Sequence, residues 1–191
     1  MGKYSGRDPH LRLITDACPW GRGGAYTVDM WIVGWLATQI TAYEVKLFDH
    51  AIGDPAGQQT WEALAILIGL RLYKQWWQSS RSVLEVGADN VTALAMVTLM
   101  EAKGPGVNLV ARELALDLAD GCYRPDITQH IPGITNGCSD TLSRRFQPGK
   151  TFILPKVLAK IAESEIPLRE NKYYRAIAPP SGRGADEEKG A

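Results

Sequence analysis

Two aspartates in this sequence stand where predicted β-strands end, a common place for reactive side chains. Asp16 follows the alternating run "LRLIT", and Asp89 follows "SVLEVGA". In open α/β sheets, ligands collect outside the carboxyl ends of the strands, so two neighbouring parallel strands of this kind would bring both carboxylates to one place. Each aspartate taken alone is equally well explained as a turn former or a helix cap.

Two further acidic residues lie in predicted helices. Glu62 shares a helical stripe with Ile66 and Leu70, the face expected to pack on a sheet. A carboxylate on a buried apolar stripe is costly unless it is paired or binds a metal, although favourable placement near the helix N-terminus is an alternative. Asp140 has the small neighbours Cys138 and Ser139, which would let its helix approach a sheet closely. Capping or solvent exposure accounts for Asp140 equally well.

Four carboxylates brought together from separate elements would repel one another and would require cations. All-oxygen ligation favours Mg²⁺ or Mn²⁺ over zinc. Two such ions, about 3.5–4 Å apart, can activate a water and stabilise the leaving oxygen of a phosphodiester. The resulting hypothesis is a two-metal nuclease whose metal ligands are Asp16, Glu62, Asp89 and Asp140.

A histidine lies ten residues before the last of these carboxylates. His130 is the second-last residue of the short predicted strand "PDITQHI", and a Pro-Gly turn follows that strand. Because imidazole titrates near neutral pH, His130 could move a proton or help to release the product phosphate. A histidine in this position is otherwise a common surface or hydrogen-bonded residue.

The composition excludes several other classes of protein. The chain has 191 residues, 45% hydrophobic and 22% charged, which indicates one globular domain with an appendage. Its three cysteines have no CxxC spacing, so neither a disulfide framework nor a structural zinc site is predicted. No apolar run reaches the roughly 20 residues of a membrane span, and the N-terminus has no signal-peptide core. The predicted location is intracellular, cytoplasmic or nuclear, with no membrane partner.

The charge balance points to a local patch. Basic and acidic residues number 21 each, so no global field attracts a polyanion. Between Thr141 and Arg175, however, the sequence contains eight basic residues and only three acidic ones. This bias indicates either a nucleic-acid contact or a solvated surface.

Periodicity and turn residues predict an α/β chain. Extended runs are expected over 11–16, 23–35 and 40–48, although 41–51 could instead be helical. Further strands are expected over 82–89 and 125–131. Helices are expected over 60–77, 90–102 and 107–121, and a last one from residue 135 or 136 to 146.

The C-terminal part is expected to be an addition to the main domain. We divide the chain into a domain over 1–148, a basic and partly helical extension over 149–176, and a disordered tail over 177–191. The extension contains "KTFILPKVLAKIAESEI", which could form an amphipathic helix after Pro155, whereas the tail consists of proline, glycine and charged residues.

Four motifs in order resemble the ribonuclease H domain of retroelement (retrotransposon) reverse transcriptase polyproteins. They are "LITDACPWGRGGA", "QQTWEALAIL", "LEVGADNVTAL" and "HIPGITNGCSDTLSR", and the similarity runs from Leu11 to Phe146. The resemblance implies a five-stranded mixed sheet of order 3-2-1-4-5 with helices on both faces. It also implies cleavage of the RNA strand of RNA/DNA hybrids, which leaves a 5′-phosphate and depends on Mg²⁺ or Mn²⁺.

The resemblance also assigns roles to single residues. The four carboxylates match the metal ligands of the family, His130 matches its mobile histidine, and Asn136 matches its intervening asparagine. Asn90, directly after Asp89, is a candidate nucleic-acid contact, as is Arg144 in the basic stretch. Recognition of the hybrid would then depend on its shape, 2′-hydroxyls and backbone.

Two departures from the family affect the expected partners. The region 30–59 is long for the second and third strands of the family, and no basic helix-loop insertion precedes "VNLVARELAL". By the resemblance, a polymerase domain would supply the missing grip on the hybrid. Two other readings stay open: a non-catalytic module that binds nucleic acid or scaffolds a polymerase, and a two-metal nuclease or recombinase of the same fold that acts on DNA.

Overall fold

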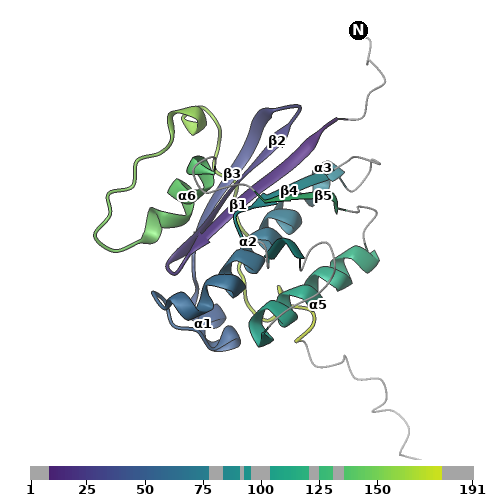
Figure 1. The fold of residues 1–191 in the computed structure, drawn as a ribbon, viewed down its shortest axis with the longest axis vertical. Helices are drawn as coiled ribbons and strands as arrows, with labels where there is room; N and C mark the ends of the chain where they lie inside the picture. Colours follow the sequence, from purple (N-terminus) through teal and green to yellow (C-terminus); the bar gives the residue numbers. More distant parts are fainter. Residues whose placement is uncertain are drawn as a thin grey trace, which may run out of the picture.

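The computed structural model describes residues 9–77, 84–90, 93–95, 104–120, 125–130 and 136–177 (Figure 1). Most of the helix predicted over 90–102 lies outside the described residues. So do the Pro-Gly turn after His130 and the tail beyond residue 177.

A five-stranded mixed sheet forms the centre of the fold, in the order β3-β2-β1-β4-β5. The strand pairs β3–β2 and β2–β1 are antiparallel, whereas β1–β4 and β4–β5 are parallel. This is the predicted order, so the expected fold class is confirmed. The strands are β1 (Leu11–Cys18), β2 (Gly21–Val28), β3 (Trp31–Gln39), β4 (Leu84–Ala88) and β5 (Pro125–His130).

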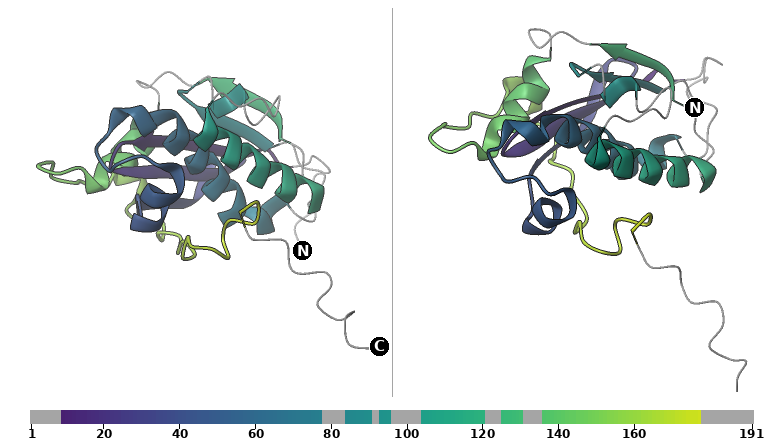
Figure 2. Two further views of the ribbon diagram at one scale, coloured as in Figure 1. Left: turned by 90° about the horizontal axis from the view of Figure 1, so that it is seen from below. Right: turned by 60° about the horizontal axis from the view of Figure 1, so that its bottom comes forward.

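The helices lie on both faces of the sheet, as predicted. Helix α2 (Gln58–Leu72) packs on one face with α5 (Pro105–Asp120) alongside it, and α6 (Gly137–Ser143) packs on the other (Figure 2). Because α2 is enclosed by the sheet and α5, every residue from Thr60 to Leu70 is buried. Such all-round burial explains why α2 is apolar on every side.

Two glycines allow the helices to approach the sheet closely. A Cβ atom on Gly69 of α2 would lie 2.8 Å from a side-chain methyl of Leu13, and one on Gly23 of β2 would lie 2.5 Å from the backbone nitrogen of Ser143. Since real Cβ atoms do not come so close to other atoms, any larger residue would push α2 or α6 away from the strands.

The region 23–48 differs from the prediction. The run predicted as one strand over 23–35 is a hairpin, which turns at Asp29 and Met30, both with positive φ. The run 40–48, predicted as the next strand, is instead largely helix α1 (Ala42–Phe48), as the alternative reading had it. Thr41 and Glu44 form a reciprocal capping box, which satisfies the first free backbone N–H groups and favours helix over strand.

The helices predicted over 60–77 and from residue 135 or 136 are present in outline. The run 60–77 forms α2 and the short α3 (Lys74–Trp77), preceded by the 3-10 turn η1 (Pro55–Gly57). Helix α6 begins after Asn136 and is followed by the 3-10 turn η2 (Arg144–Phe146). None of the described helices is both long and apolar enough to cross a membrane.

The amphipathic helix predicted after Pro155 is not formed. The structure has one 3-10 turn there, η3 (Lys156–Leu158), and the chain continues without helix along the edge of the sheet. The backbone N–H of Ser164 donates to the carbonyl of Trp35 at 2.8 Å, and Trp35 Nε1 donates to the carbonyl of Ile161 at 2.7 Å. Bonds to β3 therefore replace the helical ones, so tertiary context overrides local propensity.

Candidate active site

The register of the parallel strands brings two of the predicted carboxylates level with each other. Ile14 of β1 pairs with Gly87 of β4. Continuing that register by two residues places Asp89 beside Asp16, both at the carboxyl edge of the sheet. The predicted convergence of the two aspartates is therefore confirmed, although β1 does not end at Asp16 as predicted but continues to Cys18.

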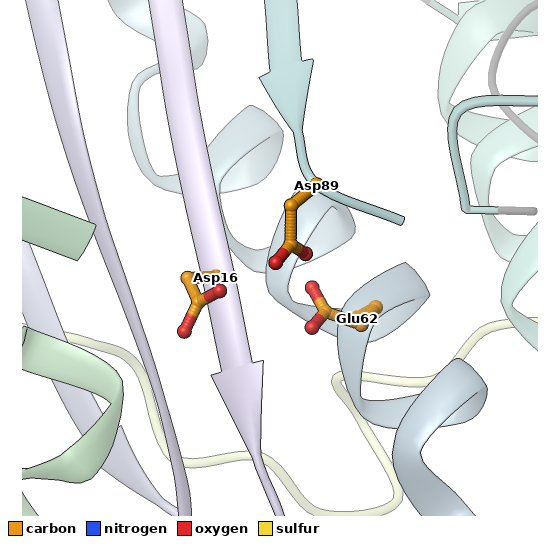
Figure 3. A group of neighbouring side chains, drawn as sticks. All are labelled: Asp16, Glu62 and Asp89. Carbon is orange, nitrogen blue, oxygen red and sulfur yellow. The ribbon is translucent and has the colours of Figure 1, made fainter. Parts of the chain in front are cut away.

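Helix α2 adds a third carboxylate. The close approach at Gly69 holds α2 against β1, and two turns earlier in the helix Glu62 reaches the same edge. Carboxylate oxygens of Asp16, Glu62 and Asp89 all lie within 4.8 Å of one another (Figure 3). Asp16 is 4% exposed and Glu62 is 2% exposed, so two of the three groups are withdrawn from water.

Burial and mutual repulsion make these groups hard to ionise together. Loss of solvation, followed by repulsion from Asp16 and Asp89, raises the pKa of Glu62 to about 9. Loss of solvation also raises the pKa of Asp16 to about 7, with repulsion from Asp89 and Asp140 adding to the shift and the Ser143 hydrogen bond opposing it. A cation at this position would relieve the cost of both effects.

The hydrogen bonds of the cluster orient its oxygens without neutralising them. Ser143 Oγ donates to Asp16 Oδ2 at 2.5 Å, and Gln58 Nε2 donates to Glu62 Oε1 at 2.8 Å. Glu62 Oε2 is buried and has no hydrogen-bond partner among the described residues. A buried carboxylate oxygen without a donor, facing two other carboxylates, fits a hard divalent cation such as Mg²⁺ or Mn²⁺.

Among the described residues, the carboxylate cluster contains Asp16, Glu62 and Asp89 but not Asp140. The Asp140 carboxylate accepts a 2.7 Å hydrogen bond from Arg144 Nε, one turn later on α6. It is nevertheless near enough to Asp16 to raise the pKa of that group. Its role as a fourth metal ligand stays a prediction.

The other predicted site residues lie around the same edge. His130 ends β5 and pairs with Ala88, next to Asp89, while its side chain lies outside what the structure describes. Asn90 Oδ1 accepts the backbone N–H of Ala93 and so caps a helical turn. Asn136 is 2% exposed and contacts the carbonyl of Thr15 through Nδ2. Both asparagines therefore have structural contacts, and their nucleic-acid contacts stay predictions, as does that of Arg144.

Sequence reasoning missed Ser143 and Gln58. Each lies close in sequence to a predicted ligand: Gln58 one helical turn before Glu62, and Ser143 three residues after Asp140. On a helix those spacings place two side chains on one face. The spacing could therefore have identified Gln58 as a partner of Glu62. The bond from Ser143 to Asp16 depends on how α6 docks on β1, for which local sequence carries no signal.

Comparison with solved structures identifies the fold. LC11-RNase H1, crystallised in complex with an RNA/DNA hybrid, superposes with a TM-score of 0.54 at 15% identity, over 69% of this chain and 92% of that one. The chain therefore has the ribonuclease H fold. No family model and no curated protein matches the sequence.

Two further ribonuclease H structures resemble the chain at a TM-score of 0.49. The N-terminal ribonuclease H domain of a Mycobacterium tuberculosis protein, solved as a fusion with maltose-binding protein, is 12% identical over 71% of this chain and 95% of that one. Ribonuclease H1 from the halophilic archaeon Halobacterium salinarum is 14% identical over 71% of this chain and 94% of that one.

Proposed function

We propose that this protein is a metal-dependent endoribonuclease that cleaves the RNA strand of RNA/DNA hybrids. The observation that carries the proposal is the cluster of Asp16, Glu62 and Asp89, whose oxygens converge within 4.8 Å at the carboxyl edge of a ribonuclease H fold. The similarity of the chain to LC11-RNase H1, which was solved with an RNA/DNA hybrid, supports the choice of substrate.

The carboxylates would bind the metal ions, and two polar neighbours would orient the carboxylates. Asp16, Glu62 and Asp89 would hold Mg²⁺ or Mn²⁺, with Asp140 as a candidate fourth ligand. When bound, two such ions would supply an activated water and a counter-charge for the leaving oxygen. Ser143 and Gln58 fix the orientation of two of these carboxylates.

His130 is the candidate for proton movement. Its position at the end of β5, level with Ala88, is one residue from the level of Asp89. From there an imidazole could accept or donate a proton as the RNA strand is cut, leaving a 5′-phosphate. Replacing His130 with alanine should slow turnover without removing metal binding, and an unchanged rate would count against this role.

The origin in a retroelement reverse transcriptase is also part of the proposal. It is supported by the order of the four motifs between Leu11 and Phe146. In that setting a polymerase domain would be the natural partner and would contribute to binding of the hybrid.

The direct test is cleavage of an end-labelled RNA/DNA hybrid by the purified chain, with Mg²⁺, with Mn²⁺ and with chelator. We expect metal-dependent cutting of the RNA strand alone and complete loss of cutting in Asp89→Asn. RNA/RNA and DNA/DNA duplexes of the same sequence are the controls. Cleavage of DNA duplex without hybrid cleavage would show a nuclease of another specificity, and no cutting by a folded, metal-binding chain would favour a non-catalytic module.

A further inference from the structure

The segment over 147–162, here called the C-terminal arm, lies beside α6 and projects from the side of the sheet that α6 covers (Figure 1). It follows η2 and includes η3. Its apolar residues contact the sheet and α6, but none of its residues belongs to the carboxylate cluster, so its charged residues require another explanation.

The arm has a one-sided charge. Lys150, Lys156 and Lys160 are exposed, and the arm contains no acidic residue. The two arginines just before it are already partnered, Arg144 with Asp140 and Arg145 with Glu163. The three lysines form no ion pair with any described residue, so their charge faces solvent.

The opposite part of the molecule shows how this surface differs. Arg71 pairs with Glu113 and Asp117, and Arg175 pairs with Asp117 and Asp120. There the chain supplies an acidic partner for each arginine. Lys74 and Lys172 lie in the same region, beside Asp117, whereas the arm carries three lysines and no acidic residue. The arm therefore concentrates positive charge locally in a chain of zero net charge.

The arm is fixed to the domain. Leu158 is fully buried in a cluster with Leu142 of α6 and Trp35 of β3. The Arg145 guanidinium lies over the ring of Phe152, with its central carbon 5.3 Å from the ring centroid. With its apolar residues anchored in this way, the arm presents the lysines at defined places, and binding a partner would not require it to be ordered first.

The arm is connected to the carboxylate cluster through α6. Leu142 contacts Leu158 in this apolar cluster, and the next residue, Ser143, donates to Asp16. A duplex with a phosphate at the carboxylates extends well beyond them and carries about one charge every 1.7 Å along its axis. Such a duplex requires a positive surface outside an acidic site.

We propose that the C-terminal arm binds the sugar-phosphate backbone of a nucleic-acid duplex through Lys150, Lys156 and Lys160. The proposal rests on the proposed function, since it places the arm beside the substrate of that same site. Lysines contact phosphates as point charges and carry no sequence information, so the arm would strengthen binding to any duplex sequence.

The test is fluorescence anisotropy with a labelled RNA/DNA hybrid and a DNA duplex of the same sequence, at several salt concentrations. All proteins carry Asp89→Asn so that nothing is cut. The arm variant changes Lys150, Lys156 and Lys160 to Gln. The matched control changes Lys46, Lys74 and Lys172 to Gln, which removes the same charge from other parts of the surface.

We expect the arm variant to bind both duplexes about tenfold or more weakly near 0.1 M salt, with the slope of log Kd against log salt reduced by about two to three. The control variant should keep both the affinity and the slope of the parent. Equal losses in the two variants, or no loss in either, would overturn the proposal, as would a parent that binds neither duplex.

This outcome is independent of the cleavage assay. A chain that cuts hybrid but does not depend on the arm lysines would contradict only the arm proposal. A chain that cuts no hybrid, yet loses duplex binding when the arm is changed, would contradict only the proposed activity.

Discussion

Glu44 and Glu62 are both almost completely buried, yet the surroundings of their carboxylates are opposite in charge. Glu44, fully buried on α1, accepts hydrogen bonds from Arg22, Arg169 and Tyr174, among others. Glu62, 2% exposed on α2, faces two other carboxylates and has one oxygen to which no described residue donates. Burial is common to both glutamates, so the neighbours decide whether the charge is stable.

The pKa values express the same difference. Burial alone would raise the pKa of Glu44, yet the two arginines outweigh it and hold the pKa at about 2. At Glu62 burial and carboxylate repulsion act together and raise the pKa to about 9. The charge of Glu44 is balanced by arginines of the folded chain itself, whereas the cluster that contains Glu62 needs a cation to reach its charged state.

The largest expected effect is on catalysis. Asp16→Asn removes one of the proposed metal ligands and should lower turnover of an RNA/DNA hybrid by about 10²–10³-fold, the scale of losing a principal charge-stabilising group. Because the change relieves repulsion in the metal-free state, the free energy of unfolding should stay the same or rise slightly. Turnover is measured by gel and stability by urea unfolding. An unfolded variant would instead indicate a structural role for Asp16.

The same substitution at the two glutamates should have opposite effects on stability. Glu44→Gln leaves Arg22 and Arg169 buried without a counter-charge and should lower the free energy of unfolding by about 3–5 kcal/mol. Glu62→Gln, measured without metal at pH 8, should leave it unchanged or raise it. Urea denaturation of both variants makes the comparison, and a similar loss in both would remove the distinction drawn here.

The two glutamates should also respond to opposite ranges of pH. The folded protein keeps the proton of Glu62 up to about pH 9, while the unfolded chain loses it near 4.5, so metal-free stability falls as pH rises through this range. For Glu44 the stabilisation is present above pH 4.5 and is lost as pH falls towards 2. Each group contributes a slope of about 1.4 kcal/mol per pH unit within its range.

Urea unfolding between pH 3 and 9 with chelator measures both slopes. Glu62→Gln should flatten the alkaline limb and leave the acid limb in place. If the alkaline limb is unchanged in this variant, Glu62 does not carry the raised pKa.

A smaller effect is expected at the serines of α6. Ser143 Oγ bonds Asp16, whereas the equally buried Ser139 Oγ bonds the carbonyl of Ile14, on the same strand. Both alanine variants should lose about 1 kcal/mol of stability. Only Ser143→Ala should also weaken Mn²⁺ binding, by about tenfold, because only Ser143 orients a candidate ligand. Equal Mn²⁺ affinities in the two variants, measured by calorimetry, would give Ser143 a purely structural role.

The sequence indicated the carboxylate cluster well because each ligand lies at a marked position. Asp16 lies near the end of β1 and Asp89 directly follows β4, two strands whose alternation and apolar content are local signals, and Glu62 is conspicuous on an apolar helix. The order of the strands in the sheet could be predicted only from the resemblance of four motifs to a known family. Periodicity indicates where strands lie in the sequence but not which strands pair.

The errors lie where tertiary contacts or short capping signals decide the structure. The sequence alone does not indicate how the charge of Glu44 is balanced, because its partner Arg169 is 125 residues away in the chain. The helix predicted after Pro155 does not form because that segment makes hydrogen bonds to β3 instead. The strand predicted over 40–48 is wrong because the capping box at Thr41 favours a helix. Asp140 is not among these errors, since its pairing with Arg144 leaves its role as a fourth metal ligand a prediction.

The most direct test of this account is a calorimetric titration of the purified, metal-free chain with Mn²⁺ and Mg²⁺, alongside Glu62→Gln and Glu44→Asp. The account predicts saturable binding by the parent, release of protons at pH 7 as the buried carboxyls ionise, and loss of both in Glu62→Gln. Glu44→Asp, if folded, should bind as the parent does. A folded parent that binds neither ion at millimolar concentration would contradict the claim that the buried carboxylates form a metal site.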